Sequence, residues 1–143
     1  MSGYVLDASV AAKWFLPSAG ETYVEEALTI LQAFAAGKTR LLVPDLFWPE
    51  ISNVFWKAFR LGRVSERAAD EAITSLAAQQ IVTASSRLLV NKAFAIAAAF
   101  HRPVYDAIYV ALAVSSNYPF VTADERFANA LATYFPIRWL GAL

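Results

Sequence analysis

The chain has 143 residues, enough for one domain around a single hydrophobic core. Hydrophobic residues make up 58% and charged residues 17%, which excludes a disordered polymer, and the lack of cysteine excludes disulfide scaffolds, zinc ribbons and cysteine nucleophiles. Twelve basic residues balance twelve acidic ones, so a nucleic-acid partner would need a local site rather than an overall positive field. His101 is the single histidine, which excludes mechanisms that need two imidazoles, such as RNA cleavage by paired histidines. Any catalytic chemistry is therefore expected to rest on carboxylates.

A membrane span is not expected from the apolar runs. The longest, residues 93–100 and 107–114, have eight residues each, whereas a spanning helix needs about 20. The first residues also lack the basic segment of a secretory signal. We therefore expect one domain over residues 1–143, located in the cytoplasm.

Short apolar runs alternate with helical patterns along the chain. The sequence predicts helices over residues 9–16, 21–36, 49–61, 66–76, 86–100, 105–115 and 124–133, with Gly37 and Gly62 ending the second and third and Ser65 capping the fourth. Strands are predicted over residues 4–6, 40–43, 81–83, 120–122 and 137–139. Strands that alternate with helices, without tight hairpins, favour right-handed crossovers. The expected fold is therefore α/β, with a short, mainly parallel sheet covered by helices on both faces.

Acidic residues stand where such a sheet places its ligands, just after a strand or at a helix start. An isolated carboxylate beside a buried segment costs several kcal/mol unless it is paired, hydrogen-bonded or bound to a cation. A shared cation site is therefore plausible for four residues, Asp7, Glu50, Asp106 and Asp124.

Helix capping is the alternative for each acid taken alone, since a carboxylate at a helix start is favourable by about 0.3 to 2 kcal/mol. Asp106 fits capping least well, because the eight apolar residues after it predict a buried helix. Asp45 and Glu125 serve as controls that are expected to cap helices and face solvent. Oxygen ligands without nitrogen or sulfur select Mg²⁺ or Mn²⁺ over zinc, and such ions suit phosphodiester hydrolysis.

Four segments in order resemble the motifs of the PIN-domain ribonucleases, in the branch of the VapC toxins. They are VLDAS at residues 5–9, PEISNV at 49–54, YDAIYVALA at 105–113 and VTADERF at 121–127. The order, the spacing and the chain length all agree with that family. The resemblance implies an α/β/α sandwich that forms a single PIN-like domain.

The resemblance also implies an activity, that of a Mg²⁺- or Mn²⁺-dependent endoribonuclease acting as the toxin of a type II toxin–antitoxin pair. The expected products carry 5′-phosphate and 3′-hydroxyl ends. The implied partners are RNA, a second copy of the chain and a small VapB-like antitoxin. Carried over residue by residue, the implied catalytic and metal-binding residues are Asp7, Glu50, Asp106 and Asp124, with the hydroxyls of Ser9 and Thr122 orienting carboxylates or water.

A basic cluster and an aromatic helix complete the candidate features. Lys57, Arg60, Arg63 and Arg67 form either a solvated helix face or a contact for RNA or the antitoxin. Of the aromatic residues on the helix predicted over residues 49–61 and just before it, Trp48 or Phe55 is expected to be partly exposed as partner surface. Trp56, turned away from Glu50, is expected in the core or across a dimer.

Other functions fit the same pattern less well. A signalling receiver domain would need adjacent acids after the first strand, but Leu6 and Ala8 flank Asp7. A haloacid-dehalogenase-like phosphatase would need an aspartate at position 9, which is Ser9. A non-catalytic binding module with an acidic pocket stays open, and metal-dependent RNA cleavage would distinguish it from an enzyme.

Overall fold

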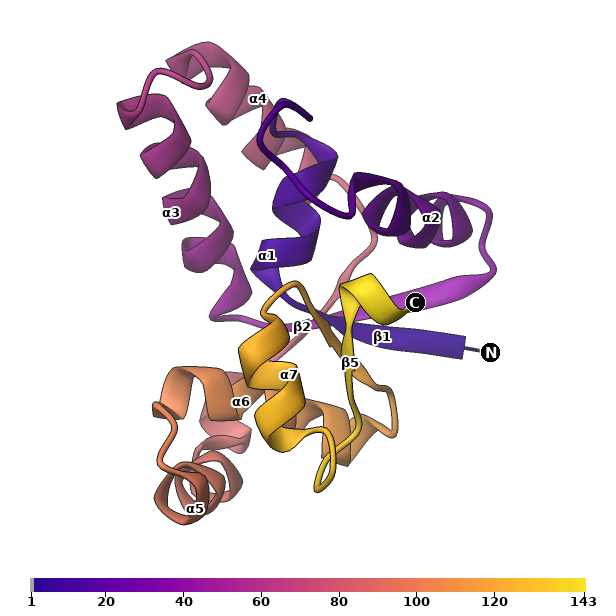
Figure 1. Cartoon of the computed structure of the whole chain (residues 1–143), viewed down its shortest axis with the longest axis vertical. Coiled ribbons are helices and arrows are strands. Elements are labelled where there is room, and N and C mark those ends of the chain that lie inside the picture. The colour runs from indigo at the N-terminus through magenta and orange to yellow at the C-terminus, as the bar shows by residue number, and fades with distance from the viewer. Residues whose placement is uncertain (1) are drawn as a thin grey trace.

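A five-stranded parallel sheet forms the centre of the computed structural model, which describes residues 2–143 (Figure 1). The strand order is β3-β2-β1-β4-β5, and all neighbouring strands are parallel. The prediction of a mainly parallel sheet is therefore confirmed. The strands are β1 (Ser2–Leu6), β2 (Thr39–Pro44), β3 (Val82–Ala84), β4 (Phe120–Thr122) and β5 (Ile137–Trp139).

Helices connect every pair of consecutive strands, as right-handed crossovers require. The α-helices are α1 (Ala8–Ala11), α2 (Val24–Ala35), α3 (Phe47–Arg60), α4 (Glu66–Ala77), α5 (Val90–Phe100), α6 (Val104–Ser116) and α7 (Glu125–Leu131). Three short 3₁₀ helices accompany them: η1 (Ala12–Trp14), η2 (Ser86–Leu88) and η3 (Leu140–Ala142).

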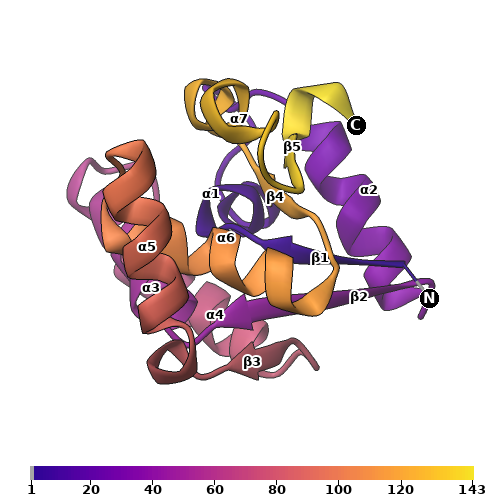
Figure 2. The same ribbon diagram turned by 90° about the horizontal axis from the view of Figure 1, so that it is seen from below.

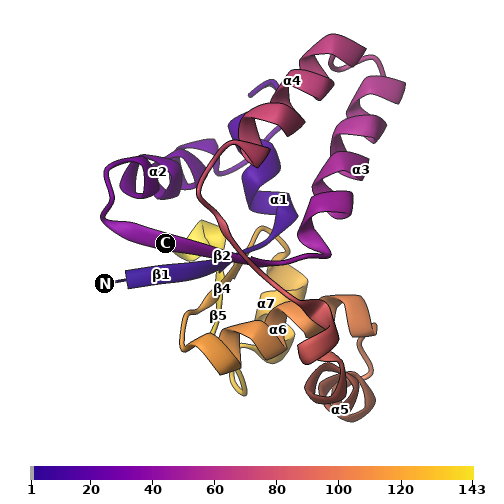
Figure 3. The same ribbon diagram turned by 180° about the vertical axis from the view of Figure 1, so that it is seen from behind.

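The helices form two layers around the sheet. Helices α1 to α4 lie on one face, and α5 to α7 lie on the other (Figures 1 and 3). This division follows from the strand order, because the chain moves outward from β1 to β3 and then returns past β1 to β4 and β5. The crossovers after β3 therefore place their helices on the opposite face. The expected sandwich of helices, sheet and helices is confirmed.

Helix α6 crosses the middle of the sheet and contacts the three strands β2, β1 and β4 (Figure 2). Val5 and Val121 on the central strands have no exposed surface, and residues 107–113 of α6 are all buried. A helix buried over seven successive residues needs an apolar sequence on every side, which the run after Asp106 supplies. The buried helix predicted from that run is confirmed.

Two of the predicted helices begin differently in the structure. Helix α2 begins at Val24 rather than at Glu21, because Tyr23 adopts a left-handed conformation (φ 55°) that cannot continue a helix. The helix expected from residue 86 is divided into η2 and α5. Ser65 does cap α4, accepting a hydrogen bond from the Ala68 amide at 3.0 Å.

Helices α3 and α4 pack together as an arm that projects beyond the sheet (Figures 1 and 3). The turn between them contains Gly62 at φ +75°, a conformation that favours glycine. The first half of α3 lies near the sheet edge, and the second half extends away from it (Figures 1 and 3). Within residues 2–143, no helix is long and apolar enough to cross a membrane.

Candidate active site

Strands β1 and β4 lie side by side where the strand order reverses, and acidic residues follow both of them. Asp7 comes directly after β1, and Asp124 stands two residues after β4. This reversal point at the carboxyl ends of the strands is the usual ligand position in open parallel sheets. Asp106 opens α6 at the same end, and Glu50 lies in the first turn of α3.

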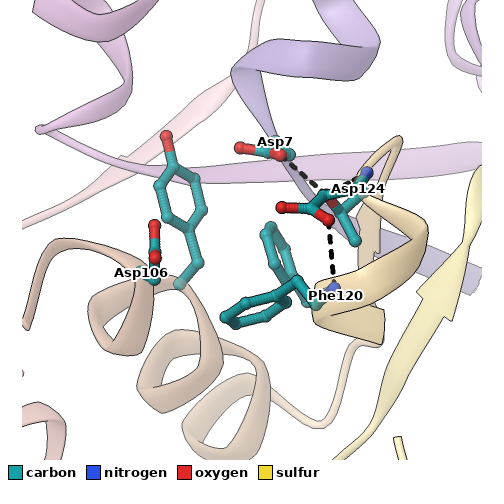
Figure 4. Close-up of a pocket in the computed structure, with 7 residues that line it drawn as sticks. Asp7, Asp106, Phe120 and Asp124 are labelled. Atoms are coloured by element: carbon teal, nitrogen blue, oxygen red, sulfur yellow. Dashed lines mark hydrogen bonds between the residues drawn. The ribbon is translucent and has the colours of Figure 1, made fainter. Parts of the chain in front are cut away.

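A small acidic pocket lies at the carboxyl ends of these strands. Asp7, Asp106 and Asp124 line it, and Figure 4 shows their carboxyl groups on different sides of one space. Aromatic rings close the apolar side. The remaining lining residues are Tyr109, Phe120, Thr122 and Phe127.

Two hydroxyl groups fix the Asp7 carboxylate. Ser9 and Thr122 each donate a hydrogen bond to Oδ2 of Asp7, at 2.6 Å and 2.8 Å. Each hydroxyl also accepts a backbone N–H, Ser9 from Ala123 and Thr122 from Asp124, both at 3.1 Å. Because the amides occupy the hydroxyl lone pairs, the hydroxyl protons point to Asp7. The loop after β4 is thereby attached to the end of β1.

Glu50 reaches the site through a tyrosine that the sequence analysis did not single out. The Tyr109 hydroxyl donates a hydrogen bond of 2.5 Å to Oε1 of Glu50. Tyr109 itself is 2% exposed, stacks on Phe120 and lines the acidic pocket. Its position three residues after Asp106 places it on the same side of α6, and that spacing was a usable signal.

The electrostatics of the site disfavour negative charge. Loss of water around the Asp7 carboxyl raises its pKa, and the two hydroxyl hydrogen bonds offset only part of that effect. Partial burial likewise raises the pKa of Glu50, and the charges of Asp7 and Asp106 add to it. The pKa of Asp106 is raised by desolvation and by the charge of Asp124. Clustered carboxylates with raised pKa values favour a bound cation.

The donor set fits a hard divalent ion. Within residues 2–143, the salt bridges involve none of these four carboxylates, so their charges lack a bonded basic partner. The same residues contain no group of three or more acidic, histidine or cysteine side chains already close enough to hold one ion. Three of the acids would therefore have to move closer together, or act through water, to share an ion.

The capping alternative applies to Asp124 as well as to the controls. Asp124 caps α7 by accepting the Phe127 amide at 3.0 Å, while its other carboxylate oxygen points into the pocket (Figure 4). Asp45 is exposed and caps η2 through the Ser86 amide (3.2 Å) and hydroxyl, and its pKa is lowered by these hydrogen bonds. Glu125 is exposed and does not line the pocket. The prediction that both controls face solvent is confirmed, but the prediction that Glu125 caps a helix is wrong, because Asp124 caps α7.

The four residues of the basic cluster lie in three different places. Lys57 and Arg63 line a hollow that adjoins the acidic pocket. Arg60 instead lies over the ring of Trp56, with its guanidinium carbon 5.5 Å from the ring centre. Arg67 is exposed and pairs with Glu71 along α4 at 3.0 Å. The four residues therefore do not form one surface.

The aromatic residues of α3 are exposed in a different order from the prediction. Trp48 is partly buried, as expected, and donates a hydrogen bond to Thr83, whereas Phe55 is buried in the core. Of the two positions expected for Trp56, the core is wrong, because this side chain is 50% exposed, and a position across a dimer stays a prediction. The arm projects beyond the sheet, so the far half of α3 has no core on the side where Trp56 and Phe59 lie.

Comparisons with known proteins agree with this architecture. The family model of the PIN domain matches residues 4–131. Ribonuclease VapC3 of Pyrobaculum aerophilum is 30% identical over 127 residues, which are 87% of this chain and 92% of that protein. The crystal structure of PAE2754 from the same organism covers 99% of this chain and 91% of its own, with a TM-score of 0.70 and 23% identity. VapBC2 of Rickettsia felis, solved bound to a DNA fragment from its promoter, gives a TM-score of 0.61 at 9% identity, covering 96% and 98%.

The fold and the position of the acids define a PIN domain. The extent of the match shows that this chain belongs to the PIN-domain family, and within it to the VapC ribonucleases. PIN-domain ribonucleases generally need a divalent metal.

Proposed function

We propose that the acidic pocket is the active site of a toxin endoribonuclease that uses Mg²⁺ or Mn²⁺, and that it acts on RNA in the cytoplasm. The observation that carries this proposal is the position of Asp7, Asp106 and Asp124 around one pocket, with Glu50 bonded to the pocket residue Tyr109. None of the four acids has a basic partner among the salt bridges of residues 2–143. Asp7 and Asp106 are the direct ligands we favour, and Glu50 and Asp124 complete the site.

The residues of the pocket divide the work. The ion, when bound, would activate water and neutralise phosphate charge. Ser9 and Thr122 hold Asp7 in one orientation, and Tyr109 does the same for Glu50. The rings of Phe120 and Phe127 restrict water on the apolar side of the pocket, which strengthens charge interactions inside it.

The partners follow from the family and from the surface of α3. VapC relatives occur in complexes with an antitoxin, and we propose a VapB-like antitoxin and a second copy of the chain as partners here. The exposed Trp56 and Phe59 give an apolar surface of the kind that anchors a protein partner. We place the antitoxin contact there.

The decisive experiment is cleavage of a structured RNA by the purified chain with Mg²⁺, with Mn²⁺ and with a chelator. We expect cleavage only when a metal ion is present, and products with 5′-phosphate ends. The cleavage rate of Asp106→Asn should be lower by more than about 100-fold, since even supporting residues of metal sites contribute 10–100-fold. Glu125→Gln is the matched control, because this exposed acid follows Asp124 but does not line the pocket. A chain inactive with every metal and RNA would be a non-catalytic module.

A further inference from the structure

A second hollow, here called the basic groove, opens directly beside the acidic pocket. Its walls come from η1, the loop before α2, and α3. Ser9 and Ala123 also line it, and the Ser9 hydroxyl is the group that bonds Asp7. The back of the acidic site is therefore one wall of the basic groove. The two hollows share no lining residue, and the hydrogen bond from Ser9 to Asp7 joins their walls.

Helix α3 contributes a continuous stripe from one site to the other. Glu50, Val54, Lys57 and Leu61 follow each other at spacings of four, three and four residues, which keeps them on one side of a helix. Glu50 faces the acids, and the other three line the groove. Lys57 stands seven residues after Glu50, about 10 Å further along the helix axis. The active-site side of α3 thus continues as a wall that carries a cation.

The charges of the groove are unequal. Lys13, Lys57 and Arg63 face one acid, Glu21. The Glu21 carboxylate binds Lys13 at 3.3 Å and Arg63 at 3.1 Å, which holds the loop before α2 against the arm. None of the salt bridges within residues 2–143 involves Lys57. Lys57 is therefore the groove cation that an external anion can pair with at the smallest cost.

The opposite side of α3 has the reverse character. The hollow between α3 and α4 is lined by Trp56 and Phe59 together with the acids Glu66 and Asp70. A polyanion is repelled from such a surface, whereas the basic groove attracts it. The apolar lining of the basic groove, which includes Leu16 and Val54, suits the sugars and bases between phosphates. These differences favour a nucleic-acid strand in the basic groove alone.

We propose that the basic groove holds the RNA strand on one side of the cleaved bond, with Lys57 bound to a backbone phosphate. This inference rests on the proposed function, because it assigns the path of that substrate. The contact positions the strand without reading its sequence, since phosphates carry no base information. Glu21, by tying Lys13 and Arg63 together, keeps the two walls of the groove at a fixed separation.

The test is binding of a fluorescein-labelled 12-nucleotide oligouridylate at several salt concentrations. All forms carry Asp106→Asn so that the strand is not cut. Each phosphate contact to single-stranded nucleic acid contributes about 0.7 to the slope of log affinity against log salt. We expect Lys57→Ala to lower that slope by about 0.7 and to weaken binding several-fold at low salt. Lys57→Arg, which keeps the charge, should retain the slope.

Two other basic residues make the result specific. Lys92→Ala removes the same charge from α5 on the other face of the sheet and should leave the slope unchanged, and Arg60→Ala should do the same because Arg60 lies over Trp56. Equal losses in Lys57→Ala, Arg60→Ala and Lys92→Ala would overturn the groove assignment and show attraction by overall charge. In the active chain, Lys57→Ala should raise KM for RNA several-fold at unchanged kcat.

The two proposals fail in different ways. If the chain with Lys57 intact cuts RNA but Lys57→Ala changes neither KM nor the salt slope, the groove proposal is wrong and the nuclease assignment stands. If the unaltered chain neither binds nor cuts RNA, both are wrong. Melting temperatures of the variants must agree with that of the parent chain, since Lys57 is exposed and its removal leaves the core intact.

Discussion

Two sides of α3 differ in the chemical character of their side chains, one being charged and the other aromatic. One side turns Glu50 and Lys57 toward the acidic pocket and the basic groove, and the other turns Trp56 and Phe59 toward solvent. A third side, with Ile51, Phe55 and Ala58, packs into the protein. The positions repeat at the helical period, about 100° per residue, so each side keeps its character along the helix.

The comparison teaches how a small domain makes room for two ligands. A helix lying flat on a sheet would need one broad apolar face, whereas the projecting arm needs only a narrow one. The side chains on the rest of the helix circumference are not needed to pack the core. Exposed aromatic patches on a domain of this size usually mark a contact surface. Under the two proposals above, the arm separates the side of α3 assigned to RNA from the side assigned to the antitoxin.

The largest effect that would sharpen this comparison concerns the aromatic side. Trp56→Ser should weaken binding of the cognate antitoxin by at least about 30-fold, the effect of losing a 2 kcal/mol anchor residue. RNA cleavage by the free chain should not change, because Trp56 lies on the opposite side of α3 from Glu50. Calorimetric titration of toxin with antitoxin measures the first quantity. Phe94→Ser, on the exposed face of α5, is the matched control, and a loss there instead would move the antitoxin to the other layer.

A smaller effect is expected on the acid side from Tyr109→Phe. Removal of the hydroxyl leaves Glu50 without the hydrogen bond that orients it, and loss of a supporting hydrogen bond near a metal site costs about 10-fold or more. We expect kcat to fall by about 10-fold. The Mn²⁺ concentration needed for half of the maximal rise in melting temperature should increase by about the same factor. Tyr105→Phe, four residues earlier and exposed, should behave like the parent. Equal behaviour of the two variants would show that Glu50 needs no orientation.

The smallest effect concerns stability without metal. The folded chain holds protons on Asp7, Glu50 and Asp106 more tightly than the unfolded chain, because their pKa values are raised on folding. Ionising them as pH rises through those values therefore destabilises the fold. Asp106→Asn escapes part of this penalty and should melt about 2 °C higher at pH 7, with the difference disappearing as pH falls toward the ordinary aspartate pKa of 3.8.

Adding Mn²⁺ should reverse that order. Only a chain that binds the ion gains stability from it, by mass action. The parent chain should therefore rise in melting temperature, and Asp106→Asn should rise much less. An equal rise in both would remove Asp106 from the ligands, and a lower metal-free melting temperature for the variant at pH 7 would show that its carboxylate is not repelled by Asp124.

Most of the fold follows from the sequence because its signals are local. The alternation of apolar runs with helical patterns correctly predicted the parallel sheet. The uninterrupted apolar run after Asp106 correctly predicted a buried helix. The positions of the acids after a strand or at a helix start predicted that they share a site, and three of them line one pocket. Topology supplied the convergence, since parallel strands all end at the same edge.

The features that the sequence could not provide depend on tertiary contacts. The late start of α2 coincides with the left-handed Tyr23, just after Glu21 and its two salt bridges to distant residues. Exposure of Trp56 depends on how far the arm reaches beyond the sheet, which helical periodicity alone does not specify. The link from Tyr109 to Glu50 joins residues 59 positions apart and was visible only as a spacing on α6.

The attachment of β4 to β1 has a consequence for the synthesis of this chain. Val5 and Leu6 pair with Phe120 and Val121, and Thr122 bonds Asp7 across 115 positions of sequence. A ribosome adds about 5–20 residues per second, so one edge of β1 waits several seconds for its neighbour. During that interval the nascent chain holds Asp7 without Asp124 and has no complete acidic site. The acidic site can therefore assemble only after the ribosome has added Asp124, which follows Asp7 by more than a hundred residues.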